Sequence, residues 1–244
     1  MNPTHQFCKY ILDKAEETIA QLRELVESSN FAKIIADYSN SYHPISLYFE
    51  LRGDLEMAEM QYREAEESYW IGAQYAYIAE GEHSLNYIAL LMKCSGVAKK
   101  TEQYSEAMSI YQKVYSCLIE MSADEKADEV FSCLGLTLCH IGEICSFQGQ
   151  YEIAYQYYIK GKNVFEDLCK RCPSFTNLQD YATTLFKLAE LALTSGQHKE
   201  EGLECAELAG IKMLSLATLT GKEEMHEKVD QCVRVYLLLG GNAL

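Results

Sequence analysis

One pattern of residues recurs four times along the 244-residue sequence, and it constrains the fold more than any other feature. The four copies occupy residues 53–65, 102–114, 149–161 and 196–208, the last being the weakest match. The first three copies place a large residue near their start, then a small one three positions later, then an aromatic one, then another small or medium one, and the fourth copy keeps the spacing with other residue types. Spacings of three and four put these side chains on one face of a helix. The pattern therefore predicts a repeated helix that begins at a tight turn.

A second helix is predicted immediately before each of these turns. Its packing positions read large, large, small, medium, and they are Tyr42, Ile45, Ser46 and Phe49, then Leu91, Cys94, Ser95 and Ala98, then Leu138, Ile141, Gly142 and Cys145, then Leu185, Leu188, Ala189 and Ala192. A small residue lets two helices approach closely. Ala58 and Ala154 are predicted to occupy such a seam in the following helix, where tyrosine would cost about 1–3 kcal/mol or more of stability.

These helix pairs resemble the tetratricopeptide repeat (TPR) family, and the resemblance covers roughly residues 31–217. It implies an all-α, right-handed α-solenoid of about four TPR-like helix pairs with flanking helices at both ends. Proline and glycine are scarce, with 3 and 14 copies, so we expect one continuous body. The expected divisions are 1–30 for an N-terminal capping helix, 31–81, 82–122, 123–173 and 174–220 for the repeats, and 221–244 for a C-terminal capping helix.

The repeat is longer than the family's usual period of about 34 residues. The large turn residues Leu55, Tyr104, Tyr151 and His198 are 49, 47 and 47 residues apart. Few breakers separate the turns, so we expect helices of about 20–25 residues. This long-helix variant resembles bacterial signalling and regulatory solenoids. Capping boxes at 122–125, 176–179 and 220–223 indicate helix starts.

Two helices are expected to flank the repeats. Residues 4–28 carry one apolar face, which is typical of an amphipathic opening helix. Residues 222–239 are apolar nearly all round. This last helix either packs on the preceding repeat as a cap, which a solenoid needs at its end, or forms a homodimer face.

The resemblance implies a concave groove lined by the first helix of each repeat. Carried over position by position, the partner-binding residues are Asn40, His43, Leu47, Glu50, Met92, Lys99, Leu136, Cys139, Glu143, Phe186, Glu190 and Leu193. Apolar pockets edged by glutamates suit an apolar peptide or helix that carries a basic group. The alternative is that the long helices fill the groove with their own side chains.

Some family members hold a peptide carboxylate with a clamp of Lys, Asn and Arg, and that clamp is missing here. His43, Leu47, Leu136 and His140 stand at its positions. An adaptor for chaperone tails is therefore not expected.

Catalytic motifs are not evident. Cys169 and Cys172 have the spacing of a redox or half-zinc motif, yet the sequence has neither a second Cys-x-x-Cys pair nor a βαβ context. Cys139 and His140 are adjacent, so on a helix they point away from each other. We expect no catalytic residues, no metal and no cofactor.

The acidic composition narrows the class of partner. A formal net charge of −15 leaves no basic stripe for phosphates, so nucleic acid is not an expected partner. The acids either form solvated helix faces or present an acidic surface to a basic partner. We see no signal peptide and no run approaching the ~20 apolar residues of a membrane span. Ten cysteines without a secretory signal indicate the cytoplasm.

Three functions are compatible with these observations. The leading one is a non-catalytic scaffold or regulatory subunit that binds a protein or peptide. The second is a peptide-sensing regulator of the bacterial type without its own DNA-binding domain, because residues 1–40 lack the basic character and length for one. The third is a thiol- or metal-dependent enzyme that uses Cys169 and Cys172.

Overall fold

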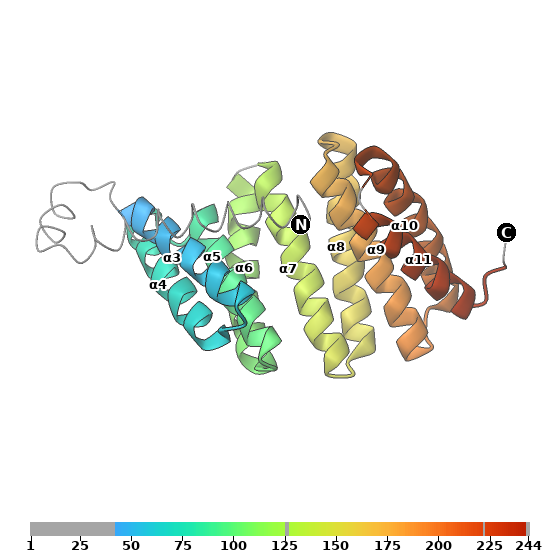
Figure 1. The fold of residues 1–244 in the computed structure, drawn as a ribbon, viewed down its shortest axis with the longest axis horizontal. Coiled ribbons are helices and arrows are strands. Elements are labelled where there is room, and N and C mark those ends of the chain that lie inside the picture. Colours follow the sequence, from blue (N-terminus) through green and yellow to red (C-terminus); the bar gives the residue numbers. More distant parts are fainter. Residues whose placement is uncertain (1–41, 125–126, 222, 243–244) are drawn as a thin grey trace, which may run out of the picture. The chain divides into compact units, whose positions relative to one another are not determined.

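The computed structural model describes residues 42–124, 127–221 and 223–242, and within them it is built of helices without a strand. Figure 1 shows the helices in chain order. Their bounds are α3 (Tyr42–Ala58), α4 (Tyr62–Glu80), α5 (Leu85–Lys100), α6 (Tyr104–Asp124), α7 (Asp128–Phe147), α8 (Tyr151–Arg171), α9 (Phe175–Ser195), α10 (Lys199–Thr220) and α11 (Glu223–Leu238). The expected opening helix at 4–28 lies outside the described residues.

The chain forms two compact units instead of the single continuous body expected from the scarcity of breakers. The first unit extends to Ile110 and the second begins at Tyr111, so the division falls inside α6. Glycine and proline mark turns, and neither is needed where a helix continues from one unit to the next.

In the first unit, α3 packs on α4 and α4 packs on α5. The seam between α3 and α4 depends on Gly53, where a Cβ atom would lie 2.5 Å from the Tyr69 ring. Glu56 is buried on the same side of α3, where it accepts hydrogen bonds from Arg52 at 2.8 Å and from Ser68 at 2.6 Å. These bonds compensate for its burial.

The first turn lies seven residues later than the sequence pattern predicts. Helix α3 continues through Gly53 and Leu55, and the turn comes between Ala58 and Tyr62. Its left-handed residue is Met60, with φ 61°, which matches Glu102 at φ 62° in the next turn. The prediction that Leu55 opens the helix after the turn is therefore wrong, because Tyr62 does.

The corrected register moves every assignment in the first repeat. Tyr62 and Tyr104 are 42 residues apart, while the two later intervals remain 47. Ala65 is fully buried and takes the seam position predicted for Ala58, which is exposed. On the first helix, the residues equivalent to Leu138, Ile141, Gly142 and Cys145 are Phe49, Arg52, Gly53 and Glu56.

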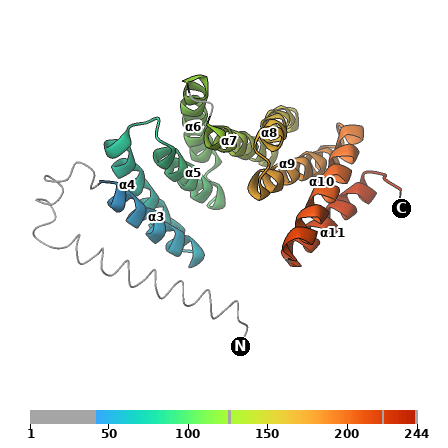
Figure 2. The same cartoon turned by 90° about the horizontal axis from the view of Figure 1, so that it is seen from above.

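In the second unit, consecutive helices from α7 to α11 pack on one another, and Figure 2 shows them following in chain order. Helices α7 to α10 have 20–22 residues, which agrees with the expected length, whereas α3, α4 and α5 have 16–19. Gly142 of α7 lies under the Tyr158 ring, and Gly161 of α8 lies against Cys139. These close approaches join α7 tightly to α8.

None of the three predicted capping residues is an N-cap, and Thr220 is the last residue of α10, three residues before α11 begins at Glu223. Ser122 lies inside α6, and α7 begins at Asp128 after Ala127. Thr176 lies inside α9, whose actual N-cap is Ser174, a side chain that accepts a hydrogen bond from the Asn177 amide. A capping box and an ordinary helical run of Ser or Thr with Glu or Gln share the same spacing.

One helix of the described residues, α7, is long and apolar enough to cross a membrane by length and composition, although no such run was expected from the sequence. Half of its 18-residue apolar window is buried inside the fold. The packing of α7 on α8 accounts for that apolar character.

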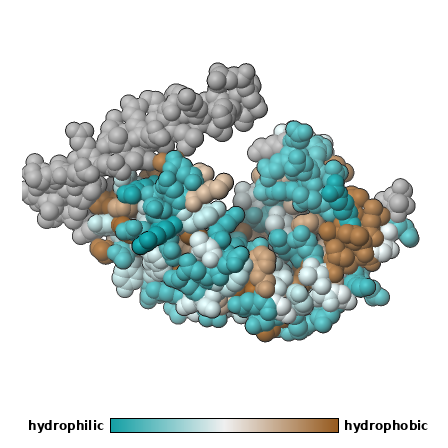
Figure 3. Space-filling model, turned by 60° about the horizontal axis from the view of Figure 1, so that its bottom comes forward, coloured by the Kyte–Doolittle hydropathy of each residue, from teal (hydrophilic) through white to brown (hydrophobic). Residues whose placement is uncertain are grey.

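Helix α11 packs on α10 and α9 through Met225, Cys232 and Val235, as a cap would. Val233, Leu237 and Leu238 remain exposed, and Figure 3 shows a hydrophobic patch over these C-terminal helices. The homodimer alternative therefore stays a prediction, and these three exposed residues are the face that a second copy would cover.

Candidate functional site

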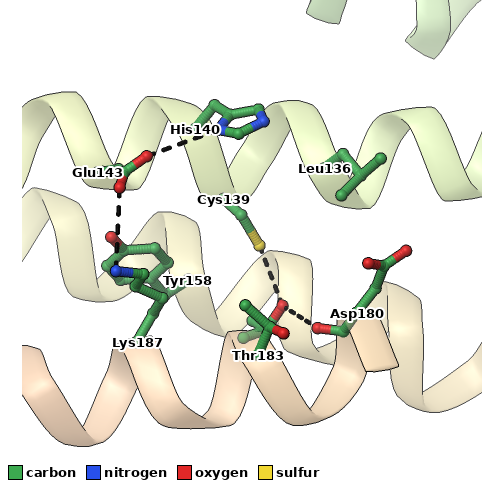
Figure 4. Close-up of a pocket in the computed structure, with 9 residues that line it drawn as sticks. Leu136, Cys139, His140, Glu143, Tyr158, Asp180, Thr183 and Lys187 are labelled. Atoms are coloured by element: carbon green, nitrogen blue, oxygen red, sulfur yellow. Dashed lines mark hydrogen bonds and ion pairs between the residues drawn. The ribbon is translucent and has the colours of Figure 1, made fainter. Parts of the chain in front are cut away.

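A groove lies between α7 and α9 of the second unit, with Tyr158 of α8 at its base (Figure 4). It consists of two adjoining cavities of about 100 Å³ and about 410 Å³ that share Glu143, Tyr158 and Lys187. We call this site the α7–α9 groove. Its lining residues are Leu136, Cys139, His140, Glu143, Ser146, Phe147, Tyr158, Asp180, Thr183, Thr184, Lys187, Glu190, Leu191 and Thr194.

Helical periodicity explains why these residues face one space. Leu138 and Ile141 of α7 are buried in the core, and so are Leu185 and Leu188 of α9. The lining residues of α7 and α9 recur at spacings of three and four along each helix, so they share a second face of it, which points toward the groove. Because α8 packs on both helices, it holds α7 and α9 side by side.

The structure brings together four of the twelve predicted groove residues. Leu136, Cys139 and Glu143 of α7 and Glu190 of α9 line the α7–α9 groove. Phe186 and Leu193 lie on α9 but are not among the lining residues.

The predicted residues of the first two repeats belong to the other unit. Leu47 and Glu50 lie on α3, and Met92 and Lys99 lie on α5. Asn40 lies outside the described residues, as does the side chain of His43. With the corrected register, the four family positions on α3 become Leu47, Glu50, Asp54 and Met57.

Ionisable side chains form a chain of close contacts across the α7–α9 groove. Lys187 Nζ lies 3.1 Å from Glu190 Oε2 and 3.9 Å from Glu143 Oε1. The opposite oxygen of Glu143 lies 3.6 Å from His140 Nδ1. The His140 ring also stacks on Tyr111 of α6, with ring centroids 5.2 Å apart.

An equivalent ion pair occurs in the first unit. Lys93 Nζ lies 2.7 Å from Asp54 and 2.8 Å from Glu50, and the Tyr69 hydroxyl donates to Asp54 at 2.7 Å. Lys93 and Lys187 both stand eleven residues before the large turn residue of their repeats, and Asp54 and Glu143 both stand eight before theirs. A lysine thus links successive first helices at matching positions.

The buried groups at the base of the groove do not provide a nucleophile. Cys139 Sγ lies 3.2 Å from Thr184 Oγ1, and burial raises the pKa of this thiol to about 12. A thiol with that pKa stays protonated at neutral pH and is a poor nucleophile. Burial, followed by the nearby Glu143, likewise raises the pKa of Tyr158.

The Cys169–Cys172 pair lies at the end of α8, and neither cysteine is among the residues that line the groove. Cys169 is half-buried, with a pKa raised by burial, and Cys172 is the exposed C-cap. All cysteines of the described segments are free. In those segments, no group of three or more His, Cys, Asp or Glu residues could hold a metal ion.

Comparison with known proteins identifies the fold. No protein-family model matches the sequence, and no curated protein matches it at a significant level. BtubC (BKLC) from P. vanneervenii is similar in structure, with a TM-score of 0.60 at 14% identity over 94% of each chain. Yeast Hif1 gives 0.54 at 13% identity over 83% of this chain and 98% of its own.

A third similar structure has repeats that are themselves described as TPR-like. It is a Podosopora anserina kinesin light chain protein with nearly identical repeats, which gives a TM-score of 0.52 at 12% identity, over 80% of this chain and 93% of its own. The chain is thus an all-α solenoid of the TPR type.

Proposed function

We propose that this chain is a non-catalytic protein- or peptide-binding module of the TPR type that acts as a scaffold or regulatory subunit. The observation that carries the proposal is the α7–α9 groove, an open cavity with apolar walls and charged edges on the helix face that TPR-type proteins use. Hif1, one of the similar structures, is described as a scaffold protein that recruits protein complexes to core histones. That role supports a binding function for this chain and does not specify its partner.

The chemistry of the groove favours a segment with apolar and basic residues. Leu136 and Phe147 supply apolar surface, and Phe147 is 60% exposed. Glu143, Glu190 and Asp180 place three carboxylates against the single lysine, Lys187. Charge complementarity of this kind selects partners and steers their approach.

The proposal is tested by selecting peptides from a random display library on the immobilised full chain. Thr183→Arg is the groove variant, because Thr183 is exposed and lines the cavity. Thr218→Arg, at an exposed position on α10, is the matched control. We expect selected peptides to bind the chain and the control and to lose binding to the groove variant. Equal binding to both variants would place recognition elsewhere, and no selected peptides would contradict the function.

Two further points remain proposals. A peptide-sensing regulator that acts through a partner protein is the alternative function, and it would use the same groove. We also propose a cytoplasmic location, which the free thiols of the nine described cysteines support, because such thiols persist in reducing compartments.

A further inference from the structure

The smaller cavity of the α7–α9 groove contains a carboxylate without a partner. Asp180 lines this cavity on α9, and its side chain is partly buried. Its carboxylate makes no hydrogen bond or ion pair with any described residue, and Figure 4 shows only its backbone carbonyl in contact, as the acceptor from the Thr184 hydroxyl at 2.8 Å. Burial alone raises the pKa of this carboxyl to about 6.

In the first unit, the residue at the position equivalent to Asp180 has a hydrogen-bond partner. Asn86 holds the equivalent place on α5, eighteen residues before the large turn residue of its repeat. Its side chain donates a hydrogen bond at 3.3 Å to the hydroxyl of Ser46 on the preceding first helix. In the second unit the position of Ser46 is taken by Gly135, which has no side chain and packs against Phe165. Asp180 thus has no hydrogen-bonding side chain at the place where its equivalent, Asn86, has Ser46.

The other charged groups of the groove do not neutralise Asp180. Lys187 pairs with Glu190 and Glu143, and His140 pairs with Glu143. The polar groups near the carboxylate are the protonated Cys139 thiol from α7 and Cys169 from α8, and neither brings a positive charge. A partly desolvated carboxylate costs free energy until a cation or a donor reaches it.

We propose that the cavity at Asp180 takes the side chain of a lysine or arginine from the bound segment. The charged end would pair with the Asp180 carboxylate, and the aliphatic stem would lie along Leu136, as long cationic side chains do on apolar surface. Thr183 stands at the exposed edge of the cavity, through which the side chain would enter. This inference rests on the proposed function of the same groove and names the residue type that the groove anchors.

The first test uses a minimal probe and does not need an identified partner. Butylguanidinium, which stands in for an arginine side chain, is titrated into the isotope-labelled full chain and followed by amide shifts in NMR spectra. We expect saturable shifts at Leu136, Cys139 and Thr183 and at least about tenfold weaker binding by Asp180→Asn. Asp230→Asn on α11 removes the same charge from an exposed site and is the matched control. Absence of shifts, or equal shifts in both variants, would overturn the inference.

The second test separates this inference from the function of the groove. The peptides selected on the full chain are sequenced and then measured against Asp180→Asn. Enrichment of lysine or arginine, with binding lost in Asp180→Asn, supports the inference. Peptides that are lost in Thr183→Arg but keep full affinity for Asp180→Asn would leave the groove as the binding site and overturn the role of Asp180.

Discussion

At the residue scale, the groove depends on side chains whose neighbours differ between equivalent positions. Gly135 of α7 and Ser46 of α3 occupy the same place on the first helices of their repeats, and only the serine has a side chain that can form a hydrogen bond. A glycine is required on α7 because a Cβ there would lie 2.7 Å from the Phe165 ring. Tight packing of α7 on α8 thus leaves Asp180 of α9 without a partner. The packing of α7 on α8 therefore affects the environment of a carboxylate on α9.

The pH dependence of stability should reveal this carboxylate. The pKa of Asp180 is about 6 in the folded chain and 3.8 as the reference, so the folded state holds a proton that the unfolded state has released. The free energy of unfolding therefore falls as pH rises from about 4 to about 6. Asp180→Asn removes this effect, and the variant should gain on the order of 1 kcal/mol relative to wild type across that window, after allowance for solvent screening.

Urea denaturation at both ends of the window measures the difference. Asp230→Asn, which changes an exposed carboxylate, should show a constant difference from wild type at the two pH values. A constant difference for Asp180→Asn as well would mean that its carboxylate is fully solvated in the folded chain.

At the element scale, the sequence predicted the helix pairs but misplaced the first turn, and the reason is geometric. A shift of seven residues is nearly two helical turns and rotates the predicted face by only about 20°. The set Leu55, Ala58, Tyr62 and Ala65 and the true set Tyr62, Ala65, Tyr69 and Gly72 therefore have the same spacing. Gly53 resembled a helix stop, yet the true turn uses Met60, a residue type that carries no turn signal.

The corrected register makes a direct prediction for three alanines. Ala65→Tyr and Ala154→Tyr place a large ring at fully buried positions, so each should cost about 1–3 kcal/mol or more by overpacking a seam. Ala58→Tyr, at an exposed position, should unfold like wild type. Circular dichroism during urea denaturation provides the three midpoints. A large loss in Ala58→Tyr together with none in Ala65→Tyr would restore the earlier register.

The site itself could be predicted only in part from the sequence. The family's positions identified Leu136, Cys139, Glu143 and Glu190, because these positions follow from helical spacing. Asp180 was missed because it lies in the additional turns that make α9 longer than a usual TPR helix. Lys187 was missed as well, although Lys93 occupies the same position in its repeat, and that recurrence could have been seen in the sequence.

At the scale of the whole molecule, the two faces of α11 bear on whether the protein is a monomer or a homodimer. Helix α11 buries Met225, Cys232 and Val235 and packs on α10 and α9, as the predicted capping helix would. Its outer face keeps Val233 and Leu237 exposed. The cap and the homodimer thus involve opposite faces of α11, and the molecular mass of the protein in solution distinguishes them.

Light scattering during gel filtration should give the mass of one chain, 27.7 kDa, because the cap already buries its main apolar face. The paired variant Val233→Glu with Leu237→Glu should then elute unchanged. A mass twice as large that returns to 27.7 kDa in this variant would instead assign the outer face of α11 to a homodimer.

The lysine that links α7 to α9 has a consequence for how tightly a partner can be held. A basic residue that approaches Glu143 or Glu190 must replace Lys187, so one ion pair is exchanged for another. Such an exchange contributes little net binding free energy. An acidic or neutral residue at the same place would break the ion pair of Lys187 without forming another, so its binding would be weaker. The ion pairs of this groove therefore discriminate between sequences, and affinity has to come from apolar contact and from sites that begin unpaired.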